Sequence, residues 1–117
     1  MNTEKSKAQM RKGILEYCIL LLLEENEAYV SDIIEQLKKS KLIIVEGTLY
    51  PLLTRLKNAN YLSYRWEESR QGPPRKYYAI TDTGRGFLKE LDKSWEELVN
   101  SIKNIKTIKT GNDEKNS

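Results

Sequence analysis

The sequence predicts a mainly α-helical fold with one β-hairpin, in the order helix, helix, helix, hairpin and long C-terminal helix. Three observations support this prediction. Apolar residues recur at helical spacing in four segments, the apolar period shortens to two in the segments around residues 61–68 and 75–81, and a loop rich in Gly and Pro separates those two segments. A chain of 117 residues can bury one modest core, so we expect one domain.

The first two helices are predicted over residues 10–24 and 29–41. The apolar residues of the first helix that keep helical spacing are Ile14, Cys18, Leu21 and Leu22. Further apolar residues between them make this helix apolar nearly all round, which is typical of a central core helix. Residues 1–9 are polar, and we expect them to be frayed. The second helix has one apolar stripe and ends in lysines, which suit the negative end of the helix dipole.

The third helix divides into an apolar and a polar half. Its inward stripe consists of Leu49, Leu52, Leu53 and Leu56. The outward and flanking positions carry Thr48, Tyr50, Pro51, Thr54, Arg55 and Asn58. Because Pro51 has no N–H to donate, it is tolerated best near a helix start, which predicts an N-cap at Gly47 or Thr48. Asn60 suits the left-handed conformation that ends a helix.

The hairpin and the last helix follow. In "YLSYRWEE", Leu62, Tyr64 and Trp66 alternate with polar residues, and "RKYYAIT" supplies a second strand. Such a hairpin must lean on the helices. Thr81 or Thr83 can cap a last helix that runs from about residue 82 to beyond residue 105.

A heptad seam follows this last helix. Its members, separated by 3, 4, 3, 4 and 3 positions, are Leu88, Leu91, Trp95, Leu98, Ile102 and Ile105. The seam predicts packing against another helix, either the first helix of the same chain or a second copy. A helix of about 25 residues would reach about 37 Å, beyond a domain of this size, so we favour a dimer interface. We expect residues 111–117 to be disordered.

Charge and composition narrow the function. Residues 38–81 hold nine basic and three acidic side chains, a local charge of +6 that leaves −3 for the rest of the chain. A basic centre is a possible footprint for nucleic acid, although charge clusters also occur on ordinary solvated faces. With no histidine, a single cysteine and no glycine-rich phosphate loop, we expect no catalytic residues, no metal and no cofactor, and therefore not an enzyme.

The apolar run at residues 18–23 is too short to span a membrane and lacks a cleavage site for a signal peptide. We therefore expect a cytoplasmic protein that does not bind membranes.

The order of elements is that of a winged helix-turn-helix domain, predicted over residues 1–81, with a C-terminal dimerisation helix over residues 82–110 and a tail over 111–117. A recognition helix needs an apolar face that holds it on the domain and an opposite polar face that enters the DNA major groove. The third helix has this division.

Two segments resemble a known family. "GTLYPLLTRLKNANYL" is similar to the recognition helix of the PadR family of bacterial transcriptional regulators, and "PPRKYYAITDTG" resembles its second wing strand and the entry to its last helix. "YVSDIIEQL" is a weaker third match. Lys57, Asn60 and Pro73 depart from the family's usual Glu, Gly, and Arg or Gly at these positions.

The resemblance implies a homodimer that regulates transcription as a repressor by binding a two-fold symmetric DNA operator. By matching position it suggests a set of DNA-facing residues: Thr48, Tyr50, Thr54, Arg55, Arg75 and Lys76. In the small subgroup that this chain resembles, planar aromatic ligands lie between paired tryptophans at the dimer centre, which implies Trp95 and Tyr17 as ligand-binding residues. The alternative for Trp95 is that it is only a large packing residue of the heptad seam and binds no ligand. For the whole chain, the alternative is a winged-helix module that binds protein.

Overall fold

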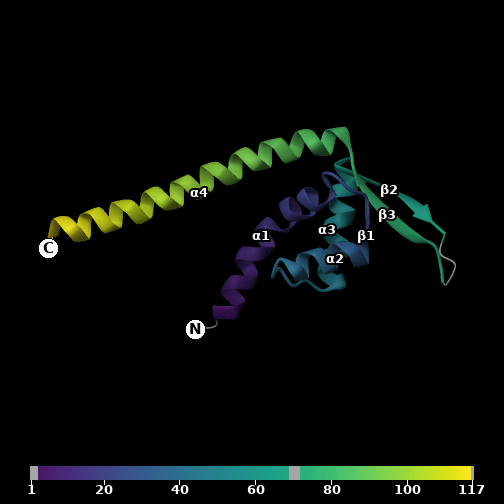
Figure 1. Ribbon diagram of the computed structural model, residues 1–117, viewed down its shortest axis with the longest axis horizontal. Helices are drawn as coiled ribbons and strands as arrows, with labels where there is room; N and C mark the ends of the chain where they lie inside the picture. The colour runs from purple at the N-terminus through teal and green to yellow at the C-terminus, as the bar shows by residue number, and fades with distance from the viewer. Residues whose placement is uncertain (1–2, 69–71, 117) are drawn as a thin grey trace.

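The computed structural model describes residues 3–68 and 72–116, with the side chains of the last helix described as far as residue 109. The elements follow the predicted order, with one short strand added before the second helix (Figure 1). They are α1 (Thr3–Leu23), β1 (Ala28–Tyr29), α2 (Val30–Lys39), α3 (Glu46–Asn58), β2 (Leu62–Glu67), β3 (Arg75–Ile80) and α4 (Asp82–Asn116). The fold is therefore mainly helical with a small antiparallel sheet, in agreement with the sequence.

Helix α1 differs from its prediction at its start and in its buried face. The helix begins at Thr3, so the prediction that residues 1–9 are frayed is wrong for residues 3–9, which are helical. The buried positions of α1 are Leu15, Ile19, Leu20 and Leu23. In the predicted stripe, by contrast, Cys18 is half-buried and Leu21 is exposed. A helix that is apolar nearly all round does not by itself indicate which side faces the core.

The sheet has three strands instead of the two predicted. The strand order is β1-β3-β2, and both pairings are antiparallel. Strand β1 has two residues, Ala28 and Tyr29, which pair with Tyr78 and Tyr77 of β3. A strand this short cannot show an alternating pattern in the sequence. Its pairing ties the wing to the N-terminus of α2.

Helix α3 lies in the core as predicted. All four of its stripe leucines are buried, with exposed fractions of 0–9 %. The helix ends at Asn58 with Ala59 as its C-cap, and Asn60, just beyond the cap, has a φ of 67°. The N–H of Tyr61 donates to the carbonyl of Leu56 at 2.9 Å. This is the left-handed helix end that Asn60 was expected to provide.

Pro51 lies deeper in α3 than predicted. The N-cap is Val45 and the first helical residue is Glu46, so Pro51 falls in the second turn. Because Pro51 has no N–H, the carbonyl of Gly47 receives no i to i−4 hydrogen bond from it. Gly47 is exposed, so water can reach that carbonyl.

Helix α4 starts on the domain and then extends well beyond it (Figure 1). At its start the Thr81 hydroxyl accepts the N–H of Gly84 at 2.9 Å, so Thr81 and not Thr83 caps the helix. The helix has 35 residues, about 52 Å in length. It continues to Asn116 through most of the segment for which we expected disorder, and Ser117 lies outside the described residues.

Candidate nucleic-acid interface

The polar side of α3 is open to solvent. The predicted DNA-facing residues Thr48, Thr54 and Arg55 are exposed, and Tyr50 is 46 % exposed. The buried leucines hold the opposite side of the helix against the core, so this polar side is held in place by packing. On one flank Lys57 lies beside the wing, with its Nζ 5.7 Å from the ring centre of Tyr64.

Arg55 is already paired within the chain. Its guanidinium forms an ion pair and a hydrogen bond with the carboxylate of Glu16 on α1. The Arg55 side chain is 69 % exposed and that of Glu16 is 27 % exposed. Arg55 therefore lies on the flank of α3 that faces α1, where solvent screens the pair only in part.

The two predicted wing cations lie on opposite faces of the sheet, because successive residues of a strand alternate. Lys76 pairs in register with Trp66 of β2. Its Nζ lies 4.5 Å from the ring centre of Tyr64 and 5.5 Å from that of Trp66. Lys76 is therefore held against the aromatic face of the wing by cation–π contacts.

Arg75 packs instead against the start of α2. Its guanidinium carbon lies 3.9 Å from the ring centre of Tyr29, and its Nη2 donates to the Ser31 hydroxyl at 3.4 Å. Tyr29 in turn packs on Tyr77, with the ring centres 4.6 Å apart. Tyr29 and Ser31 were not predictable from the sequence as neighbours of Arg75, because this contact depends on the short strand β1.

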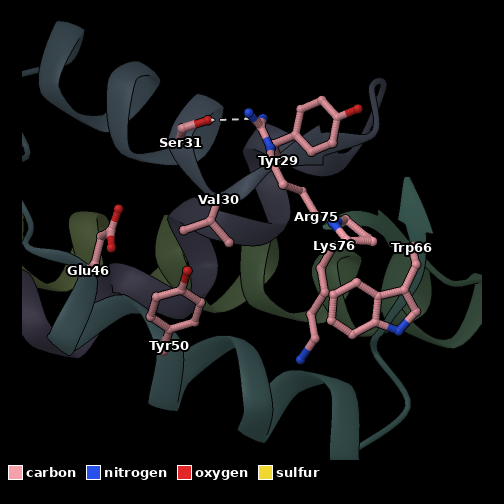
Figure 2. Close-up of a pocket in the computed structure, with 9 residues that line it drawn as sticks. Tyr29, Val30, Ser31, Glu46, Tyr50, Trp66, Arg75 and Lys76 are labelled. Atoms are coloured by element: carbon pink, nitrogen blue, oxygen red, sulfur yellow. Dashed lines mark hydrogen bonds between the residues drawn. The ribbon is translucent and has the colours of Figure 1, made fainter. Parts of the chain in front are cut away.

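A hollow of about 450 Å³ separates α3 from the wing, beside the start of α2. Figure 2 shows its lining, in which Glu46 and Tyr50 come from α3 and Trp66 and Lys76 come from the wing. Trp66 was not among the predicted site residues. The alternating pattern of β2 did place it on the same strand face as Tyr64, which is the one signal the sequence contained.

The seam of α4 is covered only at its beginning. Leu88 is buried and Leu91 is half-buried against the core. The exposed fractions of the next four seam residues, from Trp95 to Ile105, are 42, 57, 52 and 59 %. An apolar stripe of this length is unusual on a surface that faces only water.

Tyr17 connects α1 to α4 near the start of this exposed stripe. Its hydroxyl donates to Oδ1 of Asp92 at 2.5 Å, and its ring centre lies 6.2 Å from that of Trp95. The hydrogen bond to Asp92, with smaller effects of burial and of nearby negative charge, raises the pKa of Tyr17 to about 12. A shallow hollow of about 300 Å³ lies along α4 at Trp95 and Val99, without a contribution from Tyr17.

Other kinds of site find little support in the described part of the chain. No three His, Cys, Asp or Glu side chains gather there as a metal site would require. Burial raises the pKa of the Cys18 thiol, which makes this cysteine less reactive. None of the described helices is both long enough and apolar enough to cross a bilayer.

Several solved structures are similar to this chain. A PadR-like transcription factor from Bacteroides fragilis is 62 % identical, with a TM-score of 0.75 over 86 % of this chain and 98 % of that one. A PadR family transcriptional regulator from Eggerthella lenta is 30 % identical, with a TM-score of 0.81 over 87 % and 89 %. PadR from Bacillus subtilis, solved in complex with operator DNA, is 26 % identical, with a TM-score of 0.62 over 67 % of this chain and 46 % of that one.

The family comparison agrees with these structures and with the predicted resemblance. The model of the transcriptional regulator PadR-like family matches residues 19–90, which include α2, α3, the sheet and the first turns of α4. The match covers more than half of the chain and both motifs singled out in the sequence. The chain therefore belongs to the PadR-like family, whose members are DNA-binding transcriptional regulators and not enzymes.

Proposed function

We propose that this chain forms a homodimer that represses transcription by binding a two-fold symmetric operator in the cytoplasm. The observation that carries the proposal is the exposed polar side of α3, held rigidly by four buried leucines, with Lys76 of the wing across the adjoining hollow and Arg75 at the start of α2. Each α3 would enter one major groove, with half-sites about 34 Å apart.

The roles of individual residues follow from their positions. Tyr50 and Thr54 would face the groove, whereas Thr48 and Arg55 on the flank towards α1 would meet the DNA backbone. On the wing, Arg75 and Lys76 would contact phosphates or the adjacent minor groove. The operator complex of the related Bacillus subtilis PadR supports DNA as the partner.

Dimerisation is proposed through α4. The exposed stripe continues the heptad seam, and an apolar stripe of this length is stabilised when a second helix covers it. Dimerisation through the seam would bring together the seam residues Leu88, Leu91, Trp95, Leu98, Ile102 and Ile105 of the two copies. It would also fix the distance between the two recognition helices.

A second proposal concerns an effector. Trp95 is 42 % exposed beside Tyr17, so its ring is available to stack against a planar aromatic molecule near the dimer centre. The dimer would release the operator if such a ligand bound more tightly to a conformation in which the distance between the two α3 helices does not fit the DNA.

The test is an electrophoretic mobility shift with the DNA upstream of the protein's own gene, across a series of salt concentrations. We expect specific binding that weakens steeply with salt, and a double variant Arg55→Ala, Arg75→Ala whose binding is weaker and whose salt slope is shallower. Lys103→Ala, which removes an exposed cation of α4, is the matched control and should bind as the wild type does. If no fragment binds specifically at low salt, the DNA-binding proposal fails and the protein-binding alternative gains.

A further inference from the structure

Trp66 is a large apolar residue that packing among the described residues leaves mostly exposed. It is 61 % exposed near the end of β2 that leads into the wing loop. Leu62 and Tyr78, on the same face of the sheet but nearer the helices, are buried in the core. Its ring makes one edge contact, with Tyr64 at 6.0 Å between centres. An exposed tryptophan next to a cation is typical of binding surfaces.

The neighbours of Trp66 make one end of the hollow suitable for an anion. Lys76 lies against Trp66, and Tyr50 stands across the hollow from both, on α3 (Figure 2). Neither the Tyr50 hydroxyl nor the Trp66 indole N–H makes a hydrogen bond to another residue in the described part of the chain. The one acidic residue of the lining, Glu46, lies at the end of the hollow away from Trp66 and Lys76 (Figure 2).

The position of the hollow determines what would pass over it. If α3 occupies the major groove and the wing reaches the adjacent minor groove, the sugar–phosphate strand between the two grooves must cross the gap between α3 and the wing. The hollow of about 450 Å³ lies in that gap. A backbone strand offers a negative phosphate and an apolar sugar face, which match a cation with a hydroxyl and an aromatic ring.

We propose that the hollow between α3 and the wing binds one sugar–phosphate unit of this strand. Lys76 and Tyr50 contact the phosphate, and the Trp66 ring packs on the deoxyribose. The proposal rests on the proposed DNA binding. It adds a site that positions the protein on the DNA backbone and does not read the base sequence. Trp66 therefore contributes equally to binding on specific and on unrelated duplexes.

Affinity measurements test the contribution of Trp66. Trp66→Ala should weaken binding to the operator and to an unrelated duplex of equal length by the same factor, about tenfold for each half-site that loses the aromatic contact. Trp66→Phe should recover most of this loss. Lys76→Ala should also weaken both, and should make the salt dependence shallower by about one unit per half-site, whereas Trp66→Ala should leave that slope unchanged.

Fluorescence distinguishes direct contact from a structural effect on the wing. The chain has two tryptophans, Trp66 and Trp95, so the emission lost in Trp66→Phe reports on Trp66. Saturating duplex should change the wild-type emission and leave that of Trp66→Phe unchanged. Equal changes in both proteins, or Trp66→Ala binding both duplexes as tightly as the wild type, would overturn the proposal. Failure of the wild type to bind any duplex would instead refute the proposed function, and this site with it.

Discussion

The ion pair between Arg55 and Glu16 leads to a prediction about DNA affinity. In the free chain the carboxylate of Glu16 holds the guanidinium of Arg55 on the flank of α3. A phosphate that recruits Arg55 must compete with this carboxylate. Replacing Glu16 by Gln removes the competitor and keeps the size of the side chain, so Glu16→Gln should bind the operator more tightly than the wild type.

The exposure of the pair limits the size of this effect. Exposed pairs of arginine with a carboxylate contribute about 0.2–1 kcal/mol each. A two-fold symmetric complex breaks two of them, about 0.4–2 kcal/mol, which corresponds to a gain of about twofold to thirtyfold in Kd. Because the Arg55 side chain is 69 % exposed, we expect a value in the lower part of this range.

Fluorescence anisotropy with a labelled operator at fixed salt measures the effect, in a double-mutant cycle with Arg55→Ala. Any Glu→Gln change adds positive charge, so Glu27→Gln is the matched control. Glu27 pairs with Arg65 of the wing at 3.0 Å and not with a residue of α3. The gain from Glu16→Gln should exceed that from Glu27→Gln and should disappear when Arg55 is already Ala. An equal gain in the Arg55→Ala background would show that Glu16 acts on DNA directly, and the competition argument would be wrong.

Three further predictions concern the dimer, the fold and the ligand. Ile102→Asp places a charge in the exposed seam, where a second helix would have to bury it. Sedimentation at micromolar concentration should therefore show a dimer for the wild type and a monomer for the variant. A monomeric wild type would contradict the proposed dimer interface. Gly84→Ala puts a Cβ 2.1 Å from the carbonyl oxygen of Tyr61, so it should lower the free energy of unfolding by about 2–4 kcal/mol in urea titrations. Gly86→Ala is the control, because no atom lies within 4 Å of the added Cβ and the protein should be no less stable. Planar aromatic dyes should quench tryptophan fluorescence in the wild type and much less in Trp95→Ala, and equal quenching in both would assign the effect to another site.

Local patterns in the sequence predicted the elements that depend on their own residues. The stripe of four leucines in α3, the two strands of the wing and the left-handed Asn60 are all present in the structure. Each follows from contacts within one element or with the core as a whole. Periodicity was therefore sufficient to identify which residues α3 buries and which it exposes.

Contacts between distant segments were not predictable in the same way. The ion pair of Arg55 joins residues 39 positions apart, and the contact of Arg75 with Ser31 joins residues 44 positions apart. Both require the packing of α1 and the pairing of β1, whose two residues carry no periodic signal. The sequence therefore indicated which side chains are cationic and exposed, but could not show that Glu16, Tyr29 and Ser31 hold them.

Tyr17 gives a prediction in which the direction of the pH dependence can be worked out. Its hydrogen bond to Asp92 joins α1 to α4 and raises its pKa from 10.0 to about 12. Since the pKa in the folded state lies above that in the unfolded state, the bond contributes its full stability below pH 10 and loses it as the pH rises to about 12.

Tyr17→Phe removes the hydroxyl and keeps the ring, so the variant should be less stable than the wild type at pH 8, by about 1 kcal/mol for one partly exposed hydrogen bond. The difference in the free energy of unfolding between the two proteins, measured in urea at each pH, should shrink between pH 10 and 12. Tyr61→Phe is the control, because the Tyr61 ring stacks on Phe87 and its hydroxyl has no acidic partner among the described residues. A wild-type advantage that stays constant up to pH 12 would mean that the Tyr17 hydroxyl does not hold α1 to α4 through Asp92.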